Sequence, residues 1–106
     1  MITFDEFKKV ELMIGAILSA ERVEGSEKLL KLMVNVGEES PRQIIAGIGK
    51  YYDPSNLVNR QIVIAANLEP RQLMGLESQG MVLACGADEP VLLTPMKDTV
   101  PGRVVR

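Results

Sequence analysis

Residues 10–22, "VELMIGAILSAER", decide the fold of this chain. Every second position here is apolar: Val10, Leu12, Ile14, Ala16, Leu18 and Ala20. The positions between them, starting one residue before the stretch, are more mixed: Lys9, Glu11, Met13, Gly15, Ile17, Ser19 and Glu21. A period of two residues predicts a long, half-buried β-strand. Gly15 in the middle of the strand predicts a bulge or a sharp bend. Such a bend lets one strand serve two sheet edges, as small barrels require.

Two further strands are expected downstream. The turn "EGSEK" (24–28) precedes an alternating stretch in which Leu30, Leu32, Val34 and Val36 are the apolar positions. After the turn "GEESP" (37–41), "RQIIAGIG" (42–49) reads as a third strand that pairs with the second as a hairpin. Gly47 and Gly49 indicate that another backbone approaches closely there.

A short helix and two strands complete the pattern. In "YYDPSNLVN" (51–59), Asp53 is a candidate N-cap and Pro54 a candidate first helical residue. "QIVIAA" (61–66) and "GMVLACG" (80–86) are the fourth and fifth strands. This order predicts an all-β fold, a five-stranded OB-fold barrel with one short helix between strands three and four. We expect one domain over 1–106, with a core at about 8–87 and a C-terminal extension at about 88–106.

The N-terminal residues allow two interpretations. Thr3 and Glu6 have the spacing of a capping box, which predicts a short turn of helix with Phe4 and Phe7 as a lid on the core. A frayed terminus is the alternative. The start "MITFDEFKK" lacks the basic end and apolar core of a secretory signal, and no apolar run reaches the ~20 residues of a membrane span. A cytoplasmic protein without membrane contact is expected.

Composition argues against an enzyme. The chain has no His and one Cys, so a disulfide within the chain and the usual zinc sites are excluded, and the commonest acid/base residue is missing. Carboxylate or Lys chemistry stays open in principle, but the acidic residues lie mostly in loops beside Lys or Arg. We therefore expect no catalysis, no cofactor and no metal. Cys85 is expected to be a small buried hydrophobe.

Charge is distributed unevenly along the chain. Residues 1–27 carry three basic and six acidic groups, whereas 28–72 carry six basic groups against four acids: Lys28, Lys31, Arg42, Lys50, Arg60 and Arg71. An OB-fold binds ligands on strands two and three and on the loops after strands one and four, which is where this basic excess falls. The only aromatic residues, Phe4, Phe7, Tyr51 and Tyr52, lie outside the ligand-face strands. This disfavours stacking of single strands and favours the phosphates and shape of a folded RNA.

The stretch "NLEPRQLMGLESQGM" (67–81) is predicted to be a polar, flexible loop after strand four. Pro70 fixes a turn, and Arg71 offers a permanent charge to phosphate. Asn67 and Ser78 either bond the loop's own backbone or donate to ribose or phosphate. Met74 and Met81 are expected to pack in the core and at its rim.

Three motifs resemble one family. "VEGSEKLLKL", "IAGIGKYY" and "ANLEPRQLMGLESQGMVLA" are similar to the tRNA-binding domain of methionyl-tRNA synthetases, of endothelial-monocyte-activating-polypeptide-II-like proteins and of a small stand-alone bacterial tRNA-binding protein, over about residues 5–106. Because the chain starts at its own Met, it most resembles the stand-alone form; a synthetase fragment or β-subunit would look nearly identical. The resemblance implies non-catalytic binding of the tRNA elbow and outer corner, a homodimer, and an aminoacyl-tRNA synthetase as a candidate partner.

The basic excess and the polar loop together select the residues expected to bind tRNA, and the resemblance indicates where this chain departs from the family. The candidate tRNA-binding residues are Lys28, Lys31, Arg42, Lys50, Asn67, Arg71, Gln72 and Ser78. Relatives commonly read "NLKPRK" in the loop, so Glu69 and Gln72 replace two positive charges, and Met13 stands where an Arg is frequent. Weaker affinity is expected.

The C-terminal stretch "EPVLLTPMKDTVPGRVV" (89–105) contains two apolar clusters, more than a small barrel needs. It is expected to form the dimer interface; the alternative is that it covers the open barrel edge. Two other function classes stay open. One is a chaperone-like or secretion-related OB-fold dimer that binds polypeptides, which is expected to lack "SQGM" (78–81). The other is a small-molecule-binding or enzymatic barrel.

Overall fold

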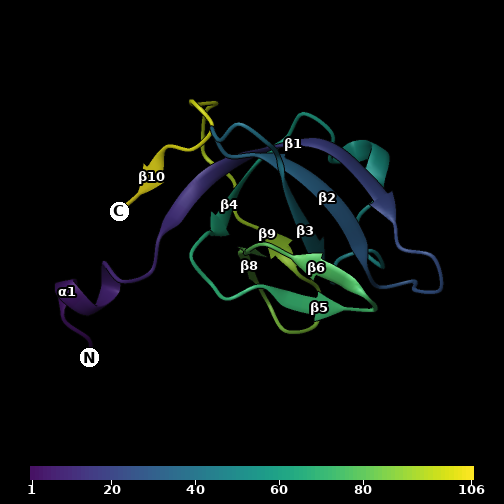
Figure 1. The fold of residues 1–106 in the computed structure, drawn as a ribbon, viewed down its shortest axis with the longest axis horizontal. Helices are drawn as coiled ribbons and strands as arrows, with labels where there is room; N and C mark the ends of the chain where they lie inside the picture. The colour runs from purple at the N-terminus through teal and green to yellow at the C-terminus, as the bar shows by residue number, and fades with distance from the viewer.

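The computed structural model describes all residues, 1–106, and its centre is an antiparallel barrel (Figure 1). In chain order the elements are α1 (Phe4–Phe7), β1 (Leu12–Arg22), β2 (Leu30–Asn35), β3 (Arg42–Ala46), the 3-10 turn η1 (Pro54–Asn56), β4 (Gln61–Ala65), β5 (Arg71–Leu73), β6 (Leu76–Ser78), β7 (Met81–Val82), β8 (Ala84–Cys85), β9 (Val91–Leu92) and β10 (Val104–Val105). The main sheet has the order β3-β2-β1-β4-β7. This nearly closed five-stranded barrel with one short turn of helix between β3 and β4 confirms the OB-fold prediction.

The long first strand serves two sheet edges, as predicted. Residues 12–16 of β1 pair with β4, and residues 16–22 pair with β2. The bulge, however, lies at Leu18 and not at Gly15, because Ile17 pairs with Val34 while Ser19 pairs with Met33. Gly15 is required for a different reason: the strands pack so closely here that a Cβ atom would collide with Cγ1 of Val34.

The bulge changes which residues of β1 are buried. An extra residue on one strand reverses the alternation beyond it. Ile17, just before the bulge, is fully buried, the bulged Leu18 is 48% exposed, and beyond the bulge Ala20 packs against the core. The expectation that Leu18 shares the buried face is wrong.

The core and the hairpin follow the predicted pattern. Leu30, Leu32, Val34 and Val36 are all buried, and β2 pairs with β3 in antiparallel register. The barrel closes on the other side of β3, where the Gln79 N–H donates to the Gln43 carbonyl oxygen at 2.8 Å. The β3 strand therefore lies between the β2 hairpin and the segment that precedes β7.

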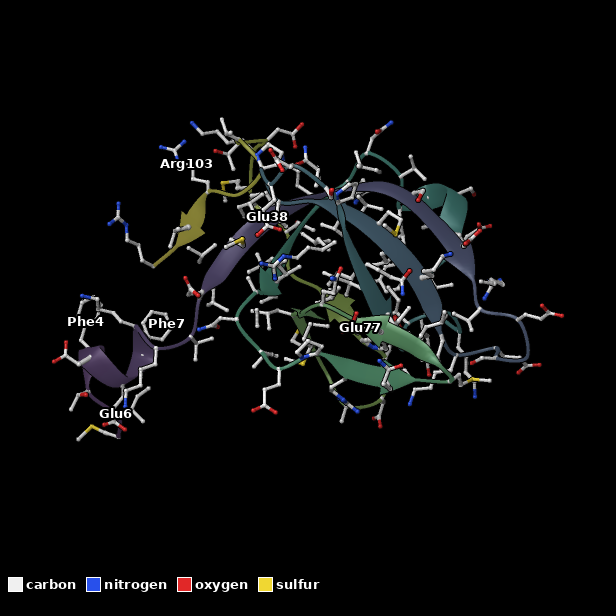
Figure 2. The ribbon with its side chains drawn as sticks, in the orientation of Figure 1. Phe4, Glu6, Phe7, Glu38, Glu77 and Arg103 are labelled. Carbon is white, nitrogen blue, oxygen red and sulfur yellow. The ribbon has the colours of Figure 1, made fainter.

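Both predicted helix starts are confirmed, but the lid is not. Asp53 caps η1 by accepting from the Ser55 N–H, and Thr3 and Glu6 form the reciprocal capping box of α1. Figures 1 and 2 show α1 projecting away from the barrel, and Phe4 is 66% and Phe7 36% exposed. These rings do not cover the core of their own chain, so that expectation is wrong. With four and three residues, α1 and η1 are too short to cross a membrane.

The segment between β4 and β7 is more regular than predicted. It forms a β5–β6 hairpin whose turn residues, Met74 and Gly75, have φ angles of 49° and 79°. Two successive positive φ angles between the paired residues Leu73 and Leu76 are those of a type I′ turn, which matches the twist of a hairpin. A hairpin therefore replaces the predicted flexible loop.

The predicted fifth strand divides into two. Its first half, β7, stays in the barrel beside β4, and its second half, β8, pairs with β9 in a separate ribbon. Cys85 is in β8 and is exposed, so the expectation of a buried thiol is wrong. The split occurs because β8 has a partner outside the barrel.

The last residues return to β1. β10 pairs with Leu12 and Met13, the Gly102 N–H donates to the Ile14 carbonyl oxygen at 2.7 Å, and the Ile14 N–H donates to the Arg103 carbonyl oxygen at 2.9 Å. The C-terminal segment therefore covers one edge of β1. It still leaves large apolar side chains exposed, among them Val91, Leu93, Met96, Val100 and Val104.

Candidate nucleic-acid interface

Two of the predicted cations meet at a groove beside the β5–β6 hairpin. The groove has a volume of about 260 Å³ and lies between the end of β3, the hairpin and the β7–β9 segment. We call it the Lys28 groove; its lining is Lys28, Leu29, Ile45, Ala46, Gly47, Ile48, Arg71, Leu73, Met81, Val82, Ala84 and Leu92. Nine of these residues are hydrophobic, and no acidic side chain is among them. The Lys28 groove therefore has an apolar floor and two basic side chains, Lys28 and Arg71.

A second hollow, of about 370 Å³, adjoins the first through Lys28 and Gly47. Lys50, Tyr51 and Asp88 also line it. Tyr51 is 52% exposed. It lies two residues after the third predicted strand, in "GIGKYY" (47–52), and is not a predicted site residue because an aromatic ring is expected to bind only from the ligand-face strands. The structure thus brings Lys28, Lys50 and Arg71 to one face and adds an exposed aromatic ring.

The backbone around Lys28 is held in place by the turn after β3. The Gly49 N–H donates to the Lys28 carbonyl oxygen at 2.7 Å. A Cβ atom on Gly49 would lie 2.8 Å from the Glu27 carbonyl oxygen, so this close approach needs a glycine, as predicted. Gly47 meets a side chain and not a backbone, because a Cβ atom there would lie 2.9 Å from Lys28 Cε.

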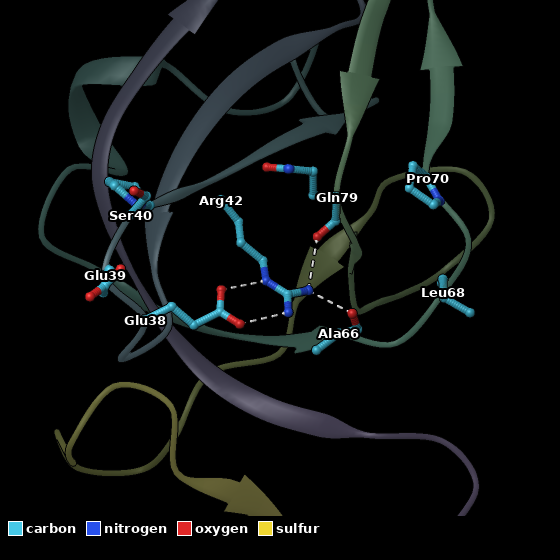
Figure 3. Close-up of a pocket in the computed structure, with 9 residues that line it drawn as sticks. Glu38, Glu39, Ser40, Arg42, Ala66, Leu68, Pro70 and Gln79 are labelled. Carbon is cyan, nitrogen blue, oxygen red and sulfur yellow. Dashed lines mark hydrogen bonds and ion pairs between the residues drawn. The ribbon is translucent and has the colours of Figure 1, made fainter.

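Arg42 lies elsewhere, and all three nitrogens of its guanidinium donate hydrogen bonds within the protein (Figure 3). Nε and Nη2 each donate to the Glu38 carboxylate at 2.9 Å, and Nη1 donates to the carbonyl oxygens of Ala66 at 2.6 Å and Gln79 at 3.2 Å. The hydrogen bonds from Arg42 lower the pKa of Glu38. Ala66 and Gln79 are the two ends of the segment that carries the hairpin. Arg42 therefore holds that segment in place.

Ser78 and Asn67 also make structural hydrogen bonds. Ser78 is buried; its Oγ accepts from the Ile45 N–H and donates to the Gly80 carbonyl oxygen, both at 2.9 Å. Asn67 Oδ1 accepts from the Glu11 N–H at 2.9 Å, and its Nδ2 donates to the Lys9 carbonyl oxygen at 2.7 Å. Each side chain links the loop to another part of the barrel.

The remaining two candidates lie outside the Lys28 groove. Lys31 pairs with Glu21 at 2.7 Å in a hollow at the tip of the hairpin, which Met74 also lines. Gln72 is exposed on β5, opposite Glu77 of β6. The hairpin tip and the β1–β2 loop therefore share a hollow, but these two polar residues are not gathered with Lys28 and Arg71. No group of three or more Cys, Asp or Glu side chains is close enough to hold a metal ion.

Comparison with known proteins points to one family. The chain is 44% identical over 105 residues to the methionine–tRNA ligase of Methanocella arvoryzae and 53% identical over 102 residues to that of Caldanaerobacter subterraneus. These matches cover 99% and 95% of the chain but only 15% and 16% of the ligases. The chain thus spans less than one fifth of the length of these curated relatives.

Two solved structures have nearly the same fold. A MetRS-related protein from Pyrococcus horikoshii superposes with a TM-score of 0.92 at 29% identity, over 100% of this chain and 98% of that one. The chaperone CsaA from Bacillus anthracis superposes with a TM-score of 0.90 at 30% identity, over 100% and 99%. Residues 12–104 match the family described as "Putative tRNA binding domain". The chain therefore belongs to the tRNA-binding domain family.

Proposed function

We propose that this chain binds folded tRNA and catalyses no reaction itself. The observation that carries the proposal is the gathering of Lys28, Lys50 and Arg71 around two adjoining hollows on the hairpin side of the barrel. Fixed positive charges supply most of the affinity for a phosphate backbone. The membership of the tRNA-binding domain family supports tRNA as the nucleic acid.

Recognition of tertiary shape accounts for the surface chemistry. Cations spread over a barrel face suit the phosphates of a folded RNA, whereas proteins that bind single strands present several aromatic platforms. Tyr51 is the one aromatic side chain among the residues that line the two hollows. We propose that the contacts are made with the elbow and outer corner of tRNA, as the resemblance to the family implies.

The relatives support a role beside an aminoacyl-tRNA synthetase. The matched ligases join methionine to tRNA, and this chain matches only a part of each. We propose that it assists aminoacylation in the cytoplasm, as a separate subunit or as a domain of a synthetase. A domain that holds tRNA would raise the effective concentration of the substrate at the catalytic domain.

A competition experiment tests tRNA binding. Labelled total tRNA is bound to the chain on filters, and unlabelled folded tRNA or poly-uridine of equal length is added. We expect folded tRNA to compete at lower concentration than poly-uridine. Equal or stronger competition by poly-uridine would overturn the proposal.

The similarity to CsaA favours one second candidate, the binding of polypeptides. That protein is a chaperone, and its fold and this one superpose over their whole lengths. The presence of "SQGM" (78–81) argues for the tRNA interpretation. The chaperone candidate would be favoured if the chain suppressed the aggregation of a heat-denatured protein and, at the same concentrations, bound no tRNA.

We also propose that the chain forms a homodimer through residues from about 88 onward. Exposed apolar residues in this region, Val91, Leu93, Met96, Val100 and Val104, support self-association. The exposed side chains of Ile2, Phe4 and Phe7 lie at the same end of the molecule as β10, as Figure 1 shows for α1 and the C-terminus. Two tRNA-binding faces in one particle would bind one L-shaped RNA more tightly than a single face.

A further inference from the structure

We propose that the Lys28 groove accepts one unstacked nucleotide of the bound RNA, with the base on the apolar floor and the phosphates at Lys28 and Arg71. This inference rests on the proposed function and adds a specific ligand to it. It assigns to the groove a contact that charge alone does not explain. A face that bound only phosphates would need no apolar hollow between its cations.

The size of the groove limits what can enter. Its volume of about 260 Å³ lies just below the range of about 300–1,000 Å³ that is usual for small-ligand pockets. One nucleotide is therefore a better match than a longer strand. The adjoining hollow, with Lys50 and the half-exposed ring of Tyr51, provides room and charge for the neighbouring nucleotide.

The chemistry of the lining matches the two parts of a nucleotide. Pockets that hold an extruded base pack its flat faces between aromatic or apolar side chains, and Leu29, Leu73 and Leu92 line this groove. The two basic side chains at the groove are complementary to a phosphate on each side of the ribose. An apolar polypeptide segment would use the floor but would leave both cations without a partner. Charge complementarity therefore favours a nucleotide.

The walls of the groove are preformed. The Leu92 N–H donates to the Tyr52 hydroxyl oxygen at 3.1 Å, and the Leu29 N–H donates to Ser26 Oγ at 3.1 Å. The hairpin is held on β3 by the bond between Ser78 and Ile45. A site that is already formed orders few side chains on binding, which lowers the entropic cost.

Gly47 offers a way to fill the groove without changing its charge. It is exposed and lines both hollows, and its φ is outside the left-handed region, so the backbone accepts another residue. The nearest atom to a new Cβ is Cε of Lys28, the flexible end of a side chain. Gly47→Leu should therefore fold and block the groove. Ser19→Leu adds the same side chain at an exposed position of β1 and is the matched control.

The first test measures tRNA affinity for both variants across a salt series. We expect Gly47→Leu to weaken binding roughly tenfold or more, the effect of losing one base contact, with an unchanged slope against log salt. Ser19→Leu should bind as the unmodified chain does. Unchanged affinity of a folded Gly47→Leu variant would overturn the inference while leaving tRNA binding intact. If the unmodified chain binds no tRNA, the proposed function itself fails.

The second test needs no variant. Backbone amide chemical shifts of the chain are followed by NMR while AMP, GMP, CMP or UMP is added, with ribose 5-phosphate as the control without a base. We expect the amides of Leu29, Gly47 and Leu73 to shift with at least one mononucleotide and to shift less with ribose 5-phosphate. Equal shifts with ribose 5-phosphate would show phosphate contact alone and overturn the inference. Shifts with a reduced, carboxymethylated α-lactalbumin and none with any mononucleotide would overturn it in favour of a polypeptide.

Discussion

The Nη1 atom of Arg42 donates a 2.6 Å hydrogen bond to the carbonyl oxygen of Ala66, the residue at which the chain leaves β4 for the hairpin. The same atom reaches the carbonyl oxygen of Gln79, where the chain returns to the barrel. Glu38 holds the other side of the guanidinium. One arginine thus fixes both ends of the segment that carries Arg71 to the Lys28 groove.

This arrangement predicts that Glu38→Gln weakens tRNA binding. Removing a carboxylate from an RNA-binding protein would tighten binding if net charge alone mattered. Loss of the charged partner of Arg42 instead loosens the hairpin, and we expect a roughly two- to tenfold weakening, the range for one hydrogen bond. Glu39→Gln changes the net charge equally at an exposed neighbour and is the control. Tighter binding by both variants, measured on filters, would show that Glu38 does not position the hairpin.

Stability should depend on pH through the same pair. The pKa of Glu38 is lowered because Arg42 donates to its carboxylate. A carboxyl group with a lowered pKa in the folded state stabilises the fold at a pH above its pKa in the unfolded state, about 4.3, and that contribution is lost as the pH falls through the folded pKa. The difference in unfolding free energy between the unmodified chain and Glu38→Gln should be constant from about pH 6 to 8 and shrink below about pH 4.3. Urea denaturation at several pH values measures it, and a pH-independent difference would refute the assignment.

The loop before β5 carries a negative charge, Glu69, which would repel the phosphates of an RNA bound beside it. Glu69 is exposed, two residues before Arg71. Glu69→Lys should tighten tRNA binding and steepen the slope of log affinity against log salt by roughly 0.7–0.9 for one added phosphate contact. Asp5→Lys makes the same change of charge at an exposed residue of α1, away from the barrel, and should leave the slope unchanged. Equal slopes for Glu69→Lys and the unmodified chain would mean that this loop lies away from the RNA.

The proposed homodimer predicts a particle of twice the chain mass, which is 11.6 kDa for one copy. Light scattering at micromolar concentration should find the dimer in the unmodified chain. Met96→Glu with Val100→Glu should give the monomer, because both side chains are exposed in the region assigned to the interface. Val58→Glu places a charge on an exposed apolar residue elsewhere and should stay dimeric. A monomeric unmodified chain would refute the dimer.

The sequence predicts the barrel well because period and turn signals are local. The strand over β1, the β2–β3 hairpin and the Asp53 cap each follow from residues close together in the chain. The bulge at Leu18 does not follow, because Ile17 and Leu18 are both apolar and the alternation can be read in either register. The β5–β6 turn is hard to predict for a related reason: Met74-Gly75 lacks the Asn or Asp that usually marks a type I′ turn.

The candidate site is predictable only in part. Charged residues can be read from a sequence, but hydrogen-bond partners that lie far apart in the chain cannot. The local basic excess selects Lys28, Lys50 and Arg71, which the structure brings to the candidate site. Arg42 and Ser78 each make a structural bond to a residue far away in the chain: Arg42 to Ala66, 24 positions on, and Ser78 to Ile45, 33 positions back. No local pattern distinguishes such residues from ones that face a ligand. The prediction for Cys85 is wrong for a similar reason, because its exposure depends on the pairing of β8 with β9.

The most direct test of tRNA binding at the Lys28 groove is the salt dependence of affinity in two double variants of equal charge. Lys28→Ala with Arg71→Ala removes both cations of the groove, and Lys9→Ala with Arg60→Ala removes two exposed cations outside it. We predict that the first pair weakens binding and lowers the slope of log affinity against log salt by roughly 1.4–1.8, for two lost phosphate contacts. The second pair should leave the slope unchanged. Equal losses in the two double variants would contradict the assignment of tRNA binding to this face of the barrel.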